Sequence, residues 1–314
     1  KDINEVHKTG LGSSAGLVTV LTASLCYVLI KDHNLNVLNP EHLKMVHNLS
    51  QVAHCQAQGK IGSGFDVAAA TYGSIIYRRF TPAIIAELPG VDIRFVDKYH
   101  KALKSLIDRV DWKIVCEPVK LPPRLKVIMG DVHNGSETVK LVGTVQRWYA
   151  NNLPRSHDIY EEINANNIIA MNKLIKLYHR SEENPQYYEK MIDNLNKDKN
   201  SDPDINELIG SINKIRELFR TITKEPGADV EPMVQTQLLN NCLDLNGVIG
   251  GVVPGAGGHD AVALIMTEKT DINEATKNNT LFKNVTWMDV KQEQIGLKEE
   301  NPKHYEDLLF DDEL

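Results

Sequence analysis

The sequence predicts a protein built from both helices and strands. Apolar residues recur at helical spacing through 40–58, and the pattern from 156 to about 223 is helical as well. Two short apolar segments, 248–253 and 261–266, have the length of strands. The glycine-rich turn 254–260 separates them, which indicates a hairpin whose bare backbone packs against another element or a ligand.

The length and composition are those of a globular protein. At 314 residues the chain can form one large domain or two ordinary ones. The formal net charge of -7 argues against broad nucleic-acid binding, but it leaves room for a local basic pocket that holds an anionic substrate. The four cysteines lie far apart, which is typical of free thiols in a reducing compartment. We therefore expect a cytoplasmic protein that binds a small molecule and neither nucleic acid nor a membrane.

The stretch 8–16, which reads Lys-Thr-Gly-Leu-Gly-Ser-Ser-Ala-Gly, predicts a phosphate site. Its glycines let the backbone turn tightly and approach a ligand closely. Ser13 or Ser14 would cap the helix that follows, and the N–H groups and dipole of that helix favour an anion. Lys8 adds a full positive charge. The alternative is an ordinary glycine-rich loop with a serine cap.

The helix after this loop, 17–30, is apolar nearly all round. It is shorter than the roughly 20 residues that a membrane span needs, and it contains Thr19, Thr22 and Ser24, so we expect a buried core helix. The chain begins at Lys1 rather than methionine and reaches the loop within ten residues. We therefore expect a further segment upstream.

The helix 40–58 contains His42, His47 and His54. Histidines are common metal ligands, and His47 and His54 are two helical turns apart. No Asp or Glu joins them between positions 42 and 65, so we favour histidines that are solvated or satisfied by the protein.

A second glycine-rich turn, 59–66, ends in Asp66 against apolar neighbours. This carboxylate could take a proton from a substrate hydroxyl, or it could cap the next helix. A strand follows at 73–80. Lys60, Arg78 and Arg79 make the region locally basic, unless they are the solvated end of that strand.

A third candidate anion site follows the apolar strand 125–130, where the turn 133–138 contains Ser136 as a predicted helix cap. The alternative is a plain cap. The remaining expected elements are helices at 97–109, 139–149, 163–179, 186–196, 205–223, 231–246 and 271–279, and a strand at 285–290.

Taken together, the three glycine-rich turns resemble motifs of the galactokinase, homoserine kinase, mevalonate kinase and phosphomevalonate kinase (GHMP) superfamily. The turn at 8–16 resembles its phosphate-binding motif, and 254–260 resembles its third motif. Four stretches are similar to the fungal-type phosphomevalonate kinase family. They are Glu-Val-His-Lys at 5–8, Gln-Gly-Lys-Ile-Gly-Ser-Gly-Phe-Asp at 58–66, Arg-Arg-Phe at 78–80 and Asn-Gly-Ser-Glu-Thr-Val-Lys at 134–140.

The resemblance implies an α+β protein with the GHMP kinase fold. Residues 1–120 would be the remainder of an N-terminal, ATP-binding domain of ribosomal-protein-S5-like type. Residues 121–314 would form a ferredoxin-like C-terminal domain, with the site between the two.

The resemblance also implies transfer of the γ-phosphoryl group of ATP to (R)-5-phosphomevalonate, in the mevalonate pathway of isoprenoid and sterol synthesis. Asp66 matches the catalytic aspartate, and Lys8 matches the lysine that neutralises the transferring group. Ser14 would help to hold Mg²⁺. The residues that would wrap the triphosphate are Gly10, Leu11, Gly12, Ser13, Ser14, Ala15 and Gly16. Those that would close against it and the substrate are Gly255, Ala256, Gly257 and Gly258.

Selecting a phosphorylated acceptor requires extra donors, and we expect them among Ser63, Arg79, Ser136 and Lys140. Relatives of the mevalonate kinase type carry a metal-binding Glu on the helix before the catalytic Asp. No acid stands there in this chain, so Mg²⁺ would rest on Ser14, Asp66, phosphate oxygens or water.

Two rival hypotheses remain at the level of sequence. Another GHMP kinase, for mevalonate or galactose, would share the phosphate loop but should lack the Asn-Gly-Ser-Glu-Thr stretch at 134–138. Alternatively, the chain is a truncated, non-catalytic fragment that needs its missing N-terminal segment or a second chain.

Overall fold

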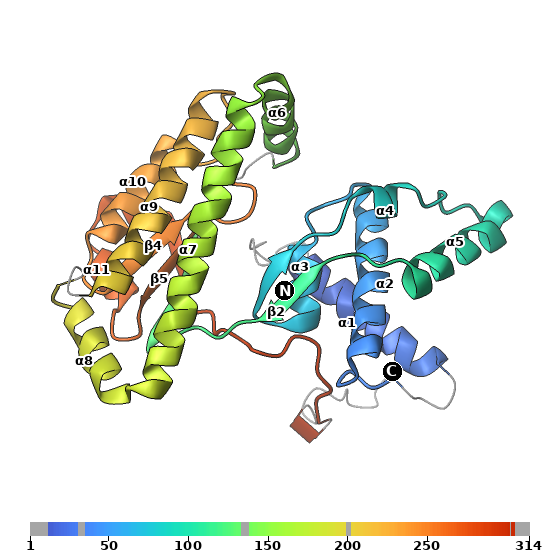
Figure 1. The fold of residues 1–314 in the computed structure, drawn as a ribbon, viewed down its shortest axis with the longest axis horizontal. Coiled ribbons are helices and arrows are strands. Elements are labelled where there is room, and N and C mark those ends of the chain that lie inside the picture. The colour runs from blue at the N-terminus through green and yellow to red at the C-terminus, as the bar shows by residue number, and fades with distance from the viewer. Residues whose placement is uncertain (1–11, 31–34, 133–137, 199–201, 302, 305–314) are drawn as a thin grey trace, which may run out of the picture. The chain divides into compact units, whose positions relative to one another are not determined.

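The computed structural model describes residues 12–30, 35–132, 138–198, 202–301 and 303–304 (Figure 1). The chain divides into two compact units. The first unit contains the described residues of 12–119 and 293–304, and the second contains those of 120–292. Each unit has its own helices, its own sheet and its own core.

The first unit is mainly helical. Helix α1 packs against α2 and α3, and strand β1 pairs antiparallel with β2. The elements are α1 (Ser13–Leu29), α2 (Pro40–Gln58), α3 (Phe65–Tyr72), β1 (Ile75–Arg78), α4 (Ala83–Ala86), the 3₁₀ turn Ile93–Phe95, α5 (Val96–Arg109) and β2 (Val115–Pro118).

The core of the first unit lies under α2. Phe80 and Trp112 are fully buried, with their rings edge to face and 5.2 Å between centroids. Val52 and Cys55 on α2 belong to the same buried cluster. This packing fixes α2 relative to the segment that follows β1 and the segment that precedes β2.

The prediction that residues 17–30 form a buried core helix is wrong for the described structure. Only Ala15, Thr19 and Ala23 of α1 are buried, whereas Leu17 is 70% exposed and Leu29 is 77% exposed. The three buried residues are four apart, so they form one stripe of small side chains on which α2 and α3 pack. No described element covers the opposite, apolar side. No described helix is long and apolar enough to cross a membrane.

The second unit is a four-stranded antiparallel sheet with helices packed on it, and its strand order is β4-β5-β3-β6. The elements are β3 (Leu125–Val132), α6 (Thr138–Asn151), α7 (Arg155–Glu183), α8 (Pro185–Leu195), α9 (Pro203–Lys224), α10 (Met233–Leu243), β4 (Val248–Val252), β5 (Ala261–Thr267), α11 (Ile272–Thr276), the 3₁₀ turn Thr280–Phe282 and β6 (Val285–Met288). Strands β4 and β5 pair antiparallel, so the predicted hairpin is confirmed.

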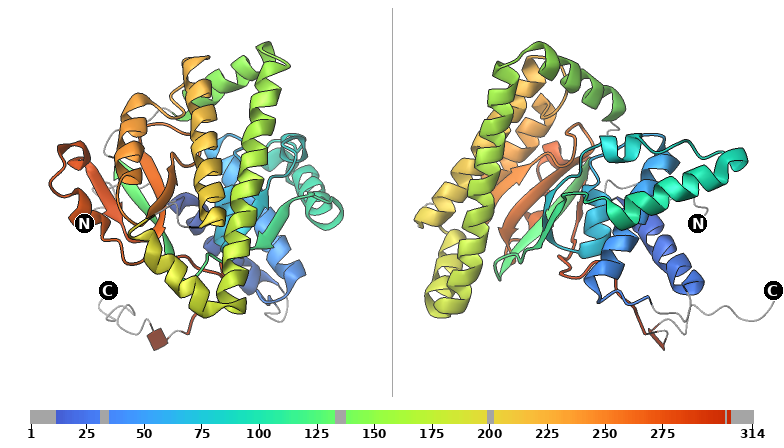
Figure 2. Two further views of the ribbon diagram at one scale, coloured as in Figure 1. Left: turned by 60° about the vertical axis from the view of Figure 1, so that its left-hand side comes forward. Right: turned by 45° about the vertical axis from the view of Figure 1, so that its right-hand side comes forward.

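Two helices organise the second unit. The long helices α7 and α9 lie side by side, and α9 and α10 pack on β4 (Figure 1, Figure 2). Leu238 and Leu239 of α10 join Val262 and Leu264 of β5 in one core cluster.

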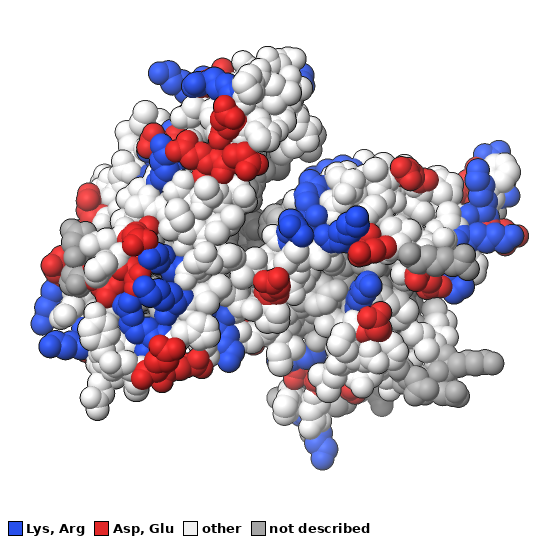
Figure 3. Space-filling model, in the orientation of Figure 1, with Lys and Arg blue, Asp and Glu red and all other residues white. Residues whose placement is uncertain are grey.

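The charged side chains on the face drawn in Figure 3 are of mixed sign, without a broad basic field.

Asp204, at the start of α9, lies in an ion cluster with α7. Its carboxylate is nearly buried and accepts hydrogen bonds from Lys173 at 2.8 Å, from Lys176 at 2.9 Å and from Arg180. Burial acts to raise the pKa of Asp204, but these hydrogen bonds and charges outweigh it and lower the pKa to about 2. The carboxylate therefore stabilises the fold in its ionised form.

We predict that Asp204→Asn lowers the free energy of unfolding at pH 7 by about 2 kcal/mol. Because the folded-state pKa is depressed, this contribution is complete above the ordinary pKa near 3.8 and is lost as the pH falls through about 2. Urea unfolding at pH 7 and at pH 3 measures it, and the gap between the two proteins should narrow at pH 3. Glu207→Gln, which removes an exposed partner of Lys173, is the matched control and should change the value by less than about 1 kcal/mol. A gap that is the same at both pH values would contradict the assignment.

Candidate active site

The first glycine-rich turn enters α1 through Gly12. This residue has φ 70°, a left-handed conformation that favours glycine, and its carbonyl accepts the N–H groups of Ala15 and Gly16 at 3.0 and 3.2 Å. Ser13 and Ser14 are the first two helical residues, and their N–H groups have no acceptor among the described residues. The start of α1 therefore offers two amide donors that no described residue occupies, together with the positive end of the helix dipole.

The prediction that Ser13 or Ser14 caps α1 is wrong. The N-cap position is Gly12, and no side chain caps the helix. Because the left-handed glycine turns the chain one residue earlier than expected, both serines fall inside the first helical turn. Of the predicted phosphate loop, Lys8, Gly10 and Leu11 lie outside the described residues.

Asp66 lies against this turn. It is the second residue of α3, and its Oδ1 accepts the N–H of Val67 at 3.0 Å. A Cβ built on Gly12 would be 3.5 Å from the Asp66 Cβ, so the carboxylate-bearing residue is in van der Waals range of the loop. The two glycine-rich turns, which are about fifty residues apart in sequence, meet within the first unit.

Gly64 is what allows the second turn to come this close. It has φ 82°, and a Cβ there would lie 2.5 Å from Gln51 Oε1 and 2.9 Å from the Tyr77 hydroxyl. Tyr77 donates a hydrogen bond to the Ser63 carbonyl at 2.9 Å, and Arg79 donates one to the Gly62 carbonyl at 2.8 Å. Burial raises the pKa of Tyr77 to about 12, which keeps its hydroxyl a donor at neutral pH. Strand β1 thus holds the turn in place.

His54 on α2 lies between the two turns. Its ring is buried, and its Nε2 is 3.2 Å from Ser14 Oγ and 2.9 Å from Gln58 Nε2. Its Nδ1 is 4.0 Å from Asp66 Oδ2. Sequence reasoning missed this contact, because it treated the three histidines of α2 alike.

The other two histidines of α2 have different surroundings. His47 is buried, hydrogen-bonds to Asn48 at 2.9 Å and packs near Tyr72 and Trp112, and burial lowers its pKa to about 4. His42 accepts the N–H of Asn36. His42 is therefore satisfied by the protein, as predicted, whereas the buried Nε2 of His47 has no hydrogen-bond partner among the described residues.

The third glycine-rich loop belongs to the second unit and is held through its backbone. Gly255, Gly257 and Gly258 all have positive φ, at 67°, 89° and 115°. The N–H of Gly258 donates to the Val230 carbonyl at 3.2 Å, and a Cβ on Gly257 would lie 2.4 Å from that same oxygen. The loop therefore packs directly on the backbone at Val230.

The segment under the loop is anchored by a buried ion pair. Glu231 is fully buried and accepts hydrogen bonds from Arg216 at 2.8 and 3.3 Å, from Arg220 at 3.0 Å and from Thr236 at 3.2 Å. Because every partner comes from α9 or α10, the residue next to Val230 is fixed to the helices. The position of the third loop depends on this network.

Besides Lys8, Gly10 and Leu11, two further predicted site residues cannot be placed. Ser136 lies outside the described residues, and Lys140 is on α6 but its side chain is not described. Ser63 is exposed on the second turn and Arg79 is exposed directly after β1, both in the same unit as Asp66. Their roles toward a substrate remain predictions.

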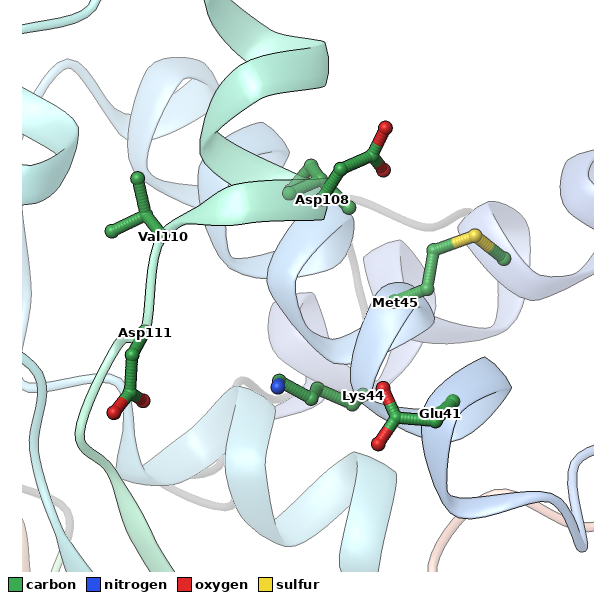
Figure 4. A pocket seen from close by; sticks show the side chains of 7 residues that line it. Glu41, Lys44, Met45, Asp108, Val110 and Asp111 are labelled. Carbon is green, nitrogen blue, oxygen red and sulfur yellow. The ribbon is translucent and has the colours of Figure 1, made fainter.

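A hollow in the first unit is not the phosphate site. It has a volume of about 490 Å³ and lies where α2 begins and α5 ends (Figure 4). Glu41, Asp108 and Asp111 line it with a single cation, Lys44. Carboxylates repel phosphate, and none of the predicted site residues lines this hollow.

Comparison with known proteins first identifies the class of protein to which the chain is similar. Residues 2–74 match the family described as GHMP kinases N terminal domain. The structure resembles the Leishmania major mevalonate kinase with R-mevalonate (TM-score 0.54, 18% identity, covering 90% of this chain and 66% of that one). It also resembles the Streptococcus pneumoniae phosphomevalonate kinase with phosphomevalonate and AMPPNP (TM-score 0.51, 18% identity, covering 87% and 65%). These matches confirm the predicted α+β, GHMP kinase fold.

Curated relatives narrow the assignment. The phosphomevalonate kinase of Candida albicans is 40% identical over 96% of this chain, which spans 67% of that protein's length. The phosphomevalonate kinase of Aspergillus fumigatus is 35% identical over 94% of the chain, which spans 57% of its length. The chain belongs to the phosphomevalonate kinase family.

We predict that Gly257→Ala destabilises the second unit more than Gly255→Ala. Both changes force a left-handed conformation on an alanine, which costs about 1 kcal/mol. Only at Gly257 does the added carbon also collide with the Val230 backbone, since nothing lies within 4 Å of a Cβ at Gly255. Urea unfolding of the two variants measures the difference, and equal losses would show that the loop does not depend on this contact.

Proposed function

We propose that the protein transfers the γ-phosphoryl group of ATP to the phosphate of (R)-5-phosphomevalonate, giving 5-diphosphomevalonate and ADP. The observation that carries the proposal is the contact of Asp66 with the glycine turn that opens α1. The names of the relatives support the choice of acceptor, and they favour it over mevalonate. The same activity is a step of the mevalonate pathway to isoprenoids and sterols.

The geometry suits phosphoryl transfer, because that reaction demands positioning and charge neutralisation more than covalent catalysis. In this proposal the free N–H groups of Ser13 and Ser14, with the dipole of α1, hold phosphate oxygens of ATP. The turn around the phosphates would be formed by small residues that let the backbone approach them, namely Gly12, Ala15 and Gly16. Gly10 and Leu11, which lie outside the described residues, would complete it. Lys8 would neutralise charge on the transferring group.

Asp66 is proposed to orient its partners rather than to act as a base. A phosphate monoester has a second pKa near 6, so the acceptor is already ionised at neutral pH. A carboxylate has no proton to remove from such a nucleophile. Its negative charge instead holds Lys8 and the cation that accompanies the nucleotide.

The donors present fit a magnesium ion that arrives with ATP. No group of three or more His, Cys, Asp or Glu that could hold a metal occurs among the described residues. Magnesium binds oxygen atoms and keeps several waters, so one hydroxyl and one carboxylate suffice when phosphates supply the rest. Ser14 would be the direct protein ligand, with Asp66 nearby. The ion would supply neutralisation of phosphate charge.

Binding of the acceptor phosphate is proposed for Ser63, Arg79, Ser136 and Lys140. Arg79 uses one N–H on the Gly62 carbonyl and keeps further donors on an exposed guanidinium. The backbone of 255–258 would close on the substrate. A cytoplasmic location is supported by four cysteines that are all free, although a relative in Arabidopsis thaliana is named as peroxisomal.

We predict that Asp66→Asn lowers turnover by about 10²–10³-fold, with a pH profile parallel to that of the unchanged protein. The loss comes from a misplaced cation and not from a missing base. ADP release in the presence of 5-phosphomevalonate, followed from pH 5.5 to 8.5, measures it.

The matched control is Asp97→Asn, because Asp97 stands in the first turn of α5, is exposed and contacts neither turn. It should leave turnover unchanged. A loss of turnover in Asp66→Asn that grows steeply below pH 6.5 would contradict the proposal. At that pH more of the acceptor phosphate is protonated, so a growing loss would mean that Asp66 serves as the base that removes the proton.

A further inference from the structure

The ring of His54 has two polar sides, and each faces a different part of the candidate site. Nε2 is within hydrogen-bond distance of Ser14 Oγ, on the loop, and Nδ1 faces Asp66 Oδ2 across 4.0 Å. The side chain is 6% exposed. It comes from α2, which packs against both α1 and α3, the helices that carry Ser14 and Asp66.

We propose that His54 is a positioning residue that fixes the Ser14 hydroxyl and the Asp66 carboxylate relative to each other. The proposal rests on the proposed function and adds a residue to it. His54 touches neither nucleotide nor acceptor, and it acts through the two side chains that would.

The contact with Gln58 assigns the proton on the ring. An amide nitrogen can only donate, so the Gln58 Nε2 at 2.9 Å requires His54 Nε2 to be the acceptor. With Nε2 as the acceptor, the ring carries its proton on Nδ1, on the side of Asp66. Charge and dipole attract each other across this gap, which is longer than a hydrogen bond.

This tautomer sets the direction of the Ser14 hydroxyl. With Nε2 as an acceptor, the Ser14 hydroxyl at 3.2 Å can contact the ring only as a donor, and it shares the single lone pair of Nε2 with the Gln58 amide. An isolated serine hydroxyl rotates freely, but one that donates in a fixed direction presents its two lone pairs on the other side. Those lone pairs are what a Mg²⁺ ion would bind. The ring therefore works as the outer partner of a metal ligand.

Asp66 is held from two sides in the same way. Its Oδ1 is occupied by the N–H of Val67, and its Oδ2 faces the ring. The plane of the carboxylate is thus set by its own helix and by α2. Removal of the ring frees both the hydroxyl and the carboxylate to rotate.

Two near-isosteric variants separate these two contacts. The amide of Gln reaches the place of Nε2, and the amide of Asn reaches the place of Nδ1. His54→Gln should therefore keep the contact with Ser14 and lose that with Asp66, and His54→Asn should do the reverse. Circular dichroism and the thermal midpoint show whether each variant is folded.

The first readout is calorimetric binding of AMPPNP over a range of Mg²⁺ concentrations. We expect His54→Asn to weaken Mg²⁺-dependent binding by about 10-fold, as is typical for loss of an outer partner, and His54→Gln to stay within about 3-fold. His47→Gln is the matched control, since His47 is buried on the same helix and is not hydrogen-bonded to Ser14 or Asp66. It should lower the thermal midpoint and leave the affinity unchanged. Equal affinities in all three variants would overturn the proposal.

The second readout needs no nucleotide. Long-range proton–nitrogen NMR of the unmodified protein should show the His54 ring proton on Nδ1, and a proton on Nε2 would overturn the proposal. Failure of the proposed function is seen separately. In that case the unmodified protein does not phosphorylate 5-phosphomevalonate. The position of the ring proton and the relative Mg²⁺-dependent affinities of the variants still decide the role of His54.

Discussion

The candidate site depends on the close approach of two helix starts, that of α1 at Gly12 and that of α3, where Asp66 is the second helical residue. Left-handed glycines at 12 and 64 make the approach possible, and any side chain at Gly64 would collide with Gln51 and Tyr77. This approach places the amide donors of Ser13 and Ser14 beside the carboxylate of Asp66. Donors attract a phosphate and the carboxylate repels it, so the arrangement makes sense for phosphate chemistry only with a cation between them. The geometry therefore favours a nucleotide that carries its metal, with Lys8 and Ser14 as the proposed protein partners.

The second unit shows a different use of charge. Arg216 and Glu231 form a buried ion pair beneath the third glycine-rich loop. Removing two charges from water costs about as much as their attraction returns, so such a pair contributes more to defining a position than to stability. Here the position defined is the backbone at Val230, on which Gly257 and Gly258 rest. The ion cluster of Asp204, whose carboxylate is also nearly buried, holds α7 to α9 and has no such loop to support.

Local features could be predicted from the sequence, and long-range ones could not. The hairpin of β4 and β5 and the bounds of α5 follow from short-range periodicity and glycine placement. The cap of α1 was mispredicted because Gly12 and the serines after it are both good cap residues, and only the backbone angle of Gly12 decides. The contact of His54 with Ser14 joins residues forty positions apart, and no local pattern encodes such a pair. Burial of α1 depends on which elements surround it, which its uniform apolarity does not reveal.

The most direct measurement of the central claim is an NMR titration of the amide-labelled protein with AMPPNP and Mg²⁺. If the start of α1 holds the phosphates, the amide signals of Ser13 and Ser14 should move further than those of residues in the middle of the same helix, such as Thr22. Signals of α3 next to Asp66 should move with them at the same concentrations. Nucleotide binding that leaves the amides of Ser13 and Ser14 unmoved would contradict the account.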